Sequence, residues 1–541
     1  MTNSRVRESV SSARRHIMKL LHAACAAALL ALSACGESGS TYNESAADYS
    51  VVAEAPVGAT DTERYEHAIP NPIHLAANEP VSTFSIDVDT ASYTNIRRFL
   101  SEGRLPPQDA VRIEELINYF DYGYTPPNQR EEPFSTTISV APSPWAEGRQ
   151  LVHIGLQGYD IERTERPPLN LVLLIDVSGS MSDQNKLPLA LDGFRLLTEQ
   201  LTENDHVSIV VYAGAAGAVL EPTRGDNQGR IREALNNLHA GGSTAGGAGL
   251  ELAYALAEEN LDPHGVNRII LATDGDFNVG ITDTEQLQDL VERKRETGIY
   301  LSVLGFGAGN YNDALMQRLA QNGNGVAAYI DSEAEAQRVL GEQANGALFP
   351  IADDVKIQVE FNPERVAEYR LIGYETRALR REDFNNDRVD AGEIGTGHSV
   401  TAIYEITPVG GPTFTEPLRY QRDQQAAATG PSEIAFLRIR YKLPGQHDSR
   451  LIERPITDAD AVNSLAQAPE AARWAAAVAG YGQLLRGDPY LNRDFDWDEV
   501  IRLAQSSRGR DENGWRNEFI QLARRAERAP PQREEREPLD G

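Results

Sequence analysis

The chain is poor in cysteine: its 541 residues include only Cys25 and Cys35. Cys25 lies inside an apolar stretch near the N-terminus, and Cys35 directly follows that stretch. If the stretch is a cleaved leader that ends in a lipid-modified cysteine, no pair of thiols is left to form a disulfide. Disulfide-rich folds are therefore excluded, and we expect packing alone to hold the domains together.

Basic residues are also few compared with acidic ones. The chain has 51 Lys and Arg and 80 Asp and Glu, which gives a net charge of −29. A charge of this sign repels phosphate backbones, so nucleic acid is excluded as a partner. The chain has no Gly-x-x-x-x-Gly-Lys phosphate loop and no His-Glu-x-x-His motif. We therefore expect no nucleotide ligand, no catalytic residues and no enzymatic activity.

A long apolar run is missing as well. The apolar core from Leu20 to Ala34 has 15 residues, whereas a membrane-spanning helix needs about 20. It follows a stretch with five basic residues, and this order is typical of a signal peptide, which we predict over residues 1–34. Its removal would leave 46 basic and 79 acidic residues and a charge of −33.

The apolar core ends in Leu32-Ser33-Ala34-Cys35-Gly36, which resembles the bacterial lipoprotein box. The resemblance implies that Cys35 receives a diacylglyceryl group and becomes the first residue of the mature protein. Two or three acyl chains anchor a protein firmly, whereas one anchors it only marginally. We therefore expect a lipidated flexible tether over residues 35–78 and a protein of the bacterial cell envelope, lipid-anchored to the outer membrane or to the outer face of the inner membrane.

The middle of the chain alternates between buried strands and amphipathic helices. Continuous apolar runs such as Leu171–Ile175 and Ile299–Leu304 are typical of parallel strands that are covered on both faces. Helical stretches separate them, so residues 168–348 are predicted to form a doubly wound, Rossmann-like α/β domain. Such domains bind their ligands at the carboxyl ends of the strands.

Strand patterns of period two lie both before and after this domain. The simplest arrangement is one β-sandwich into which the α/β domain is inserted, with helical segments at both ends. The predicted parts are a helical N-terminal unit at 79–125, sandwich strands at 126–167 and 349–445, a helical C-terminal region at 446–529 and a disordered tail at 530–541.

Oxygen-bearing side chains gather where two predicted strands end. Asp176, Ser178 and Ser180 follow the first strand, Asp274 follows a later one, and Thr244 lies in a Gly-rich loop between them. Because the carboxyl ends of parallel strands share one edge of the sheet, these groups can meet there. Hard oxygen ligands with few charges suit Mg²⁺ or Mn²⁺.

This pattern of Asp-x-Ser-x-Ser, a middle Thr and Thr-Asp-Gly resembles the von Willebrand factor type A domain. The resemblance implies that the five residues hold a divalent ion at a metal-ion-dependent adhesion site, and that an Asp or Glu of a protein partner completes the shell. Phe84–Tyr93 and Gly514–Phe519 resemble the flanking signatures of a bacterial lipoprotein family with this domain at its centre.

Two interpretations of the ion stay open at this point. In the first, the protein is a lipid-anchored binding or assembly protein that engages an acidic residue of its partner through the metal. In the second, the metal is purely structural, or the chain itself fills the open position, and the protein is an enzyme or an enzyme accessory such as an adaptor for an ATPase.

A second metal candidate lies in the acidic loop that contains Asp383, Asn385 and Asp387, with Asp390 and Glu393 following. The first three residues have the spacing of a calcium-binding loop. However, Arg388 occupies the position where such loops need Gly, and Glu393 comes one place early. A Ca²⁺ site and a solvated hairpin are both compatible with this sequence.

Overall fold

The computed structural model describes most of the chain beyond the N-terminal region. The described ranges are 63–127, 132–213, 215–241, 246–275, 284–308, 311–415 and 432–530. The predicted signal peptide, Cys35, Thr244 and residues 531–541 of the predicted tail lie outside these ranges. Within them, no helix combines the length and the apolarity that crossing a membrane requires.

The central domain is built on a six-stranded sheet with the order β10-β9-β8-β5-β6-β7. All neighbouring pairs are parallel except β6 and β7, which form an antiparallel hairpin at one edge. The strands are β5 (Leu169–Asp176), β6 (His206–Ala213), β7 (Ala215–Arg224), β8 (Val266–Thr273), β9 (Ile299–Phe306) and β10 (Ala327–Ile330).

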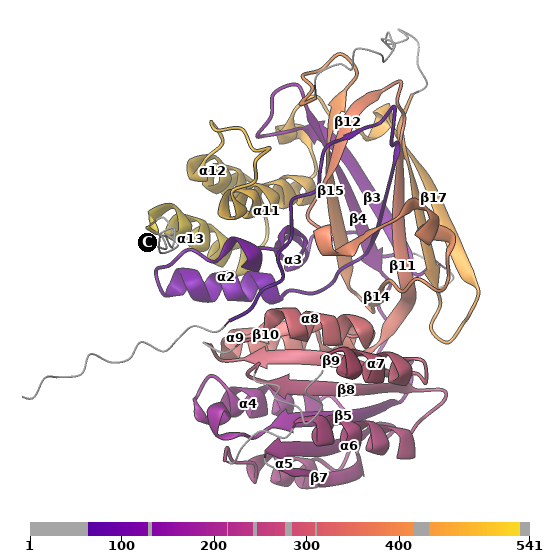
Figure 1. The fold of residues 1–541 in the computed structure, drawn as a ribbon, viewed down its shortest axis with the longest axis vertical. Helices are drawn as coiled ribbons and strands as arrows, with labels where there is room; N and C mark the ends of the chain where they lie inside the picture. Colours follow the sequence, from indigo (N-terminus) through magenta and orange to yellow (C-terminus); the bar gives the residue numbers. More distant parts are fainter. Residues whose placement is uncertain are drawn as a thin grey trace, which may run out of the picture. The chain divides into compact units, whose positions relative to one another are not determined.

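Helices cover both faces of this sheet (Figure 1). Along β5, Leu171 and Leu173 pack into one apolar core, while Val172 and Leu174 pack into the other. This explains why the strand is apolar at every position from Leu171 to Ile175 and not only at alternate ones. The prediction of a doubly wound α/β domain is confirmed. One face carries α4 (Leu187–Thr198), α5 (Gln228–Asn236), α9 (Glu333–Ala336) and α10 (Ala344–Leu348), and the other carries α6 (Gly246–Glu259), α7 (Thr284–Arg295) and α8 (Asp313–Asn322).

A β-sandwich is formed by strands from both sides of the α/β domain in sequence, as predicted. Two antiparallel sheets enclose one apolar core. The first sheet is β1 (His74–Leu75), β12 (Val366–Ile372), β15 (Ser399–Pro408), β4 (Gln150–Gly158) and β3 (Phe134–Pro142). The second is β13 (Ala378–Leu379), β2 (Val81–Ser85), β11 (Pro350–Phe361), β16 (Glu433–Lys442) and β17 (Ser449–Thr457), and β14 (Gly392–Gly395) pairs with β11.

Some strands lie where the sequence predicted other structure. β2 falls in the predicted helical N-terminal unit and pairs with β11, and β17 falls in the predicted helical C-terminal region and pairs with β16. β17 is an edge strand with charged, exposed residues, so it lacks the apolar pattern of a core strand. The described residues of the predicted tether, 63–78, are hydrogen-bonded to the domains, for instance from Arg64 N to Tyr311 O at 3.2 Å.

The two terminal helical segments share one apolar core. In it, the rings of Phe120, Trp474 and Phe519 pack edge to face. The helices are α2 (Ala91–Ser101), α3 (Ile113–Asn118), α11 (Glu470–Arg486), α12 (Trp497–Ser507) and α13 (Trp515–Arg528). The short 3-10 turns are η1 (Gln108–Ala110), η2 (Gly179–Ser182), η4 (Glu375–Arg377), η5 (Arg381–Asn385), η6 (Asp458–Asp460) and η7 (Leu465–Gln467), and η3 (Gln337–Glu342) is a π-helical turn.

Candidate metal centre

Two carboxylates end neighbouring strands at one edge of the central sheet. Asp176 is the last residue of β5, and Asp274 directly follows β8, which pairs with β5 in parallel register. Both side chains are fully buried, with 0% exposure. The sequence predicted that these two residues lie at the same edge of the sheet. The parallel register of β5 and β8 places them there.

The loop after β5 orients two hydroxyl groups next to Asp176. The backbone N–H of Ser178 donates a hydrogen bond of 2.8 Å to Asp176 Oδ1. The hydroxyls of Ser178 and Ser180 lie 3.0 Å apart, with Ser178 buried and Ser180 exposed. The loop therefore forms a row of oxygen atoms that runs from a buried carboxylate to the protein surface.

Thr273 connects the two strand ends. Its hydroxyl donates to Asp176 Oδ2 at 3.5 Å and accepts from the backbone N–H of Gly275 at 3.2 Å. Gly275 has a φ of 102°, a conformation that residues with a side chain rarely adopt. The Thr-Asp-Gly sequence thus turns the chain sharply, directly after the second carboxylate.

Burial raises the pKa of the Asp176 carboxyl to about 6; hydrogen bonds from Ser178 lower it, and the nearby Asp274 raises it further. Paired buried carboxylates beside neutral hydroxyls are a donor set that fits a small, hard divalent cation such as Mg²⁺ or Mn²⁺. Thr244, the fifth predicted ligand, lies outside the described residues. Among the described residues, no three His, Cys, Asp or Glu side chains come together in a metal-binding arrangement, so any ion here depends on hydroxyl ligands.

Lys186 is a member of this centre that the sequence analysis missed. Its ammonium donates to Asp274 Oδ2 at 2.9 Å, and the two side chains are 8% and 0% exposed. The Lys186 methylenes lie against Gly307, where an added Cβ would come within 2.2 Å of Lys186 Cε. Gly307 therefore leaves room for a lysine that neutralises one of the two carboxylates.

Replacing Lys186 by Met is expected to raise the affinity for Mg²⁺ and Mn²⁺ by at least about tenfold, because a positive charge near the ion is removed while the apolar packing is kept. Titration calorimetry with MnCl₂ measures this. Lys294→Met is the matched control, since its ion pair with Glu258 is partly exposed. Weaker binding by Lys186→Met would show instead that Lys186 orients Asp274 for the metal.

The proposed calcium loop does not converge on one centre. Asp383 lies inside the 3-10 turn η5 and binds Arg380, the residue before that turn, at 3.0 Å. Asp387 pairs with Arg440 at 2.9 Å, and Asp390 pairs with Arg295. Asn385 ends the turn η5, and Glu393 lines a pocket to which Asp390 also contributes. The structure therefore does not bring the five residues together as a calcium site. Arg380 next to the turn, Arg440 of β16 and Arg295 of α7 bind the loop's aspartates instead. The segment is not a hairpin either, because β13 before it pairs with β2 and β14 after it pairs with β11.

Three family models match the chain, and together they cover most of the described residues. One described as "von Willebrand factor" matches residues 59–153, one described as "von Willebrand factor type A domain" matches 170–343, and one described as "Uncharacterized protein YfbK, C-terminal" matches 346–529. Domains of the second type commonly bind a divalent metal ion and mediate protein–protein interactions, and the proteins that carry them are typically not enzymes.

The chain is also similar to individual proteins. The Escherichia coli protein named "Uncharacterized protein YfbK" is 45% identical over 468 residues, which cover 85% of this chain and 80% of that protein. Human inter-alpha-trypsin inhibitor heavy chain H4 is 31% identical over 194 residues, but these are only 20% of its length. A solved structure titled "von Willebrand factor type A from Catenulispora acidiphila" has 16% identity and a TM-score of 0.42, and covers 75% of this chain and 91% of its own.

The three family models and the Escherichia coli relative confirm the predicted resemblance to a bacterial family with a central von Willebrand factor type A domain and characteristic flanking segments. The 45% identity over most of both proteins shows that the chain belongs to the YfbK family.

Proposed function

We propose that the protein is a lipid-anchored binding or assembly protein of the bacterial cell envelope, which engages an acidic side chain of a protein partner through a divalent ion. Asp176, Ser178, Ser180, Thr244 and Asp274 would hold this ion. The observation that carries the proposal is the graded exposure of the centre: Asp176 and Asp274 are fully buried, while Ser180 is exposed.

Each of these residues has a separate role in binding. The buried carboxylates supply the negative charge, and Lys186 offsets part of it through Asp274. The hydroxyls of Ser178 and Ser180 add ligand atoms without adding charge. When bound, the ion supplies a positive centre with an open coordination position, which suits a carboxylate of the partner. The overall charge of −29 does not prevent this contact, because the Debye length is about 8 Å at physiological salt.

The support for the proposed lipid anchor and for the cell-envelope location comes from the sequence. Cys35 follows a signal-peptide pattern and lies in a sequence that resembles the lipoprotein box. We propose that acyl chains on Cys35 hold the protein at a membrane of the cell envelope, with the tether between Cys35 and the described domains. No observation in the described part of the chain favours an enzyme or an ATPase adaptor, and we propose no catalytic role.

Chelation of divalent ions is expected to abolish capture of the partner while the fold persists. About 1 mM Mg²⁺ at a Kd of about 0.1 mM adds only about 1.4 kcal/mol to the free energy of unfolding, so the melting temperature should fall by a few degrees. The measurement is a pull-down from an envelope extract with Mg²⁺ or with EDTA, next to a melting curve. The captured segment is then made as a peptide with its key Glu replaced by Gln.

Loss of capture with EDTA, and failure of the Gln peptide to bind, are the expected results. If EDTA unfolds the domain outright, the ion is structural and the proposal is wrong. Capture that persists in EDTA contradicts it as well, since the contact would then not need the ion.

A further inference from the structure

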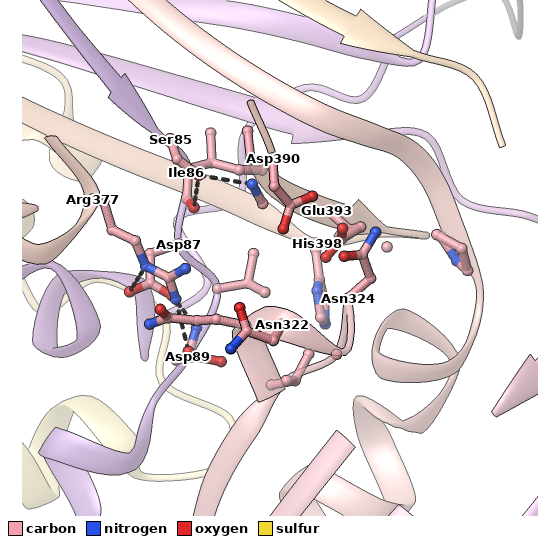
Figure 2. Close-up of a pocket in the computed structure, with 18 of the residues that line it drawn as sticks. Ser85, Ile86, Asp87, Asp89, Asn322, Asn324, Arg377, Asp390, Glu393 and His398 are labelled. Atoms are coloured by element: carbon pink, nitrogen blue, oxygen red, sulfur yellow. Dashed lines mark hydrogen bonds and ion pairs between the residues drawn. The ribbon is translucent and has the colours of Figure 1, made fainter. Parts of the chain in front are cut away.

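A partly open pocket of about 190 Å³ lies between residues of the α/β domain and residues of the β-sandwich (Figure 2). One wall comes from Ser85–Asp89, within the flanking signature Phe84–Tyr93. A second comes from the end of α8 and the turn after it, with Asn322 and Asn324, and a third from the segment Asp390–Gly395. The pocket is separate from the metal centre, because it contains none of the proposed ligands.

Most of the charged groups around this pocket neutralise one another. Arg377 binds Asp87 at 3.0 Å and Asp89 at 2.9 Å, and Figure 2 shows these three residues together at one side. Asp390 is paired with Arg295. Burial lowers the pKa of His398 to about 4, so its imidazole is neutral at physiological pH. These residues therefore leave little unbalanced charge.

Glu393 and Arg268 are the exceptions. Glu393 Oε1 and Arg268 Nε are both shielded from solvent and have no hydrogen-bond partner among the described residues. Arg268 is only 3% exposed, and its Nη1 donates to Ser302 Oγ at 2.7 Å. Both residues line the pocket, but they do not form an ion pair with each other. Burial raises the pKa of Glu393 and lowers that of Arg268.

Unpaired groups of this kind are costly. A buried donor or acceptor without a partner destabilises the fold, and a charged one does so more strongly. One carboxyl group and one guanidinium line a single pocket without a hydrogen bond to each other at Glu393 Oε1 or Arg268 Nε, and together they are complementary to a molecule that carries both charges. At roughly 30 Å³ per water molecule, the pocket has room for about six waters. This volume is similar to that of a small amino acid.

We propose that this pocket binds a free amino acid as a zwitterion, with its ammonium group at Glu393 and its carboxylate at Arg268. Asn322 and Asn324 supply uncharged polar groups on the same lining. The bound molecule would join the signature segment, the α/β domain and the sandwich. This site goes beyond the proposed metal-dependent contact and does not depend on it.

The test is calorimetric titration of the full-length chain with glycine, L-alanine, L-serine and L-glutamate, each in separate runs. Methylamine and acetate, which carry one charge each, are the comparison ligands. At least one amino acid is expected to bind at least about tenfold more tightly than either half-molecule, because both charge-assisted hydrogen bonds are made only by the zwitterion.

Glu393→Gln and Arg268→Met should each weaken this binding by at least about tenfold. Glu393→Gln replaces a buried carboxyl group whose Oε1 has no hydrogen-bond partner among the described residues by a neutral amide, so it should melt at the same or a higher temperature than the wild type, which separates lost binding from lost folding. Glu114→Gln is the matched control: Glu114 is also a fully buried carboxyl group, but it lies outside this pocket, and its replacement should leave binding unchanged.

The proposal is overturned if none of the four amino acids binds at millimolar concentration, since the pocket then holds water only. It is also overturned if Glu393→Gln binds like the wild type, or if methylamine or acetate binds as tightly as the amino acid. Capture of the protein partner is unaffected by all of these outcomes, so the two proposals fail independently.

Discussion

Replacing Arg112 by Met is expected to lower the free energy of unfolding by about 3–5 kcal/mol. Arg112 precedes α3, and its guanidinium binds both oxygens of Asp313 in α8, at 2.6 and 3.0 Å, and also binds Glu115. Asp313 and Glu115 are both 0% exposed. The substitution leaves two buried carboxylates without this cation, and the cost comes from their desolvation and mutual repulsion.

Urea unfolding followed by circular dichroism measures the effect. Arg104→Met is the matched control, because its ion pair with Glu102 is exposed, with 53% and 40% of the side chains accessible, and should contribute less than about 1 kcal/mol. Adding Asp313→Asn to Arg112→Met should recover part of the lost stability. A loss for Arg112→Met as small as that for Arg104→Met would contradict the prediction and show that water reaches the buried pair.

This ion pair also shows where prediction from the sequence ends. Arg112 and Asp313 are 201 positions apart, and neither stands in a pattern that indicates a partner. The same holds for Lys186 and Asp274, which are 88 positions apart. Such contacts depend on how distant segments pack in three dimensions, within a domain or between domains, and no local periodicity records this packing.

The features of the fold that could be predicted from the sequence are those that depend on short, local sequence patterns. The apolar run of β5 indicates a strand covered on both faces, and the covering helices are present on each. Because the carboxyl ends of parallel strands meet at one edge, the positions of Asp176 and Asp274 followed from the strand assignment alone. The edge strands were missed because β7 is rich in small exposed residues and β17 in charged ones.

At the proposed calcium loop, by contrast, a sequence pattern was present but the structure does not form the site that it indicates. The spacing of Asp383, Asn385 and Asp387 fits a calcium loop, but spacing says nothing about competing cations. Arg440 of β16 and Arg295 of α7 reach this loop from elsewhere and neutralise it. Motif spacing was informative at the candidate metal centre, where the sheet itself positions the side chains, and misleading in the loop between β13 and β14.

Replacing Asp176 by Asn is expected to reduce the affinity for Mg²⁺ or Mn²⁺ by roughly a hundredfold, because a charged ligand becomes a neutral one. The amide oxygen can still accept the hydrogen bond from Ser178 N, so the loop should keep its shape and the melting temperature without metal should change little. Ser178→Ala and Ser180→Ala should each cost less, since a hydroxyl contributes no net charge.

Calorimetric titration with MnCl₂ ranks these variants, with Asp192→Asn as the control: Asp192 is an exposed carboxylate of α4, 59% accessible and paired with Arg195. Partner capture should follow the same ranking as metal affinity. Wild-type affinity in both Asp176→Asn and Asp274→Asn would show that this edge of the sheet holds no ion. Lost capture with unchanged metal binding would place the contact elsewhere on the protein. The buried carboxylates cannot themselves reach a partner. A variant that loses metal binding and partner capture together would therefore show that the partner is recognised through the ion.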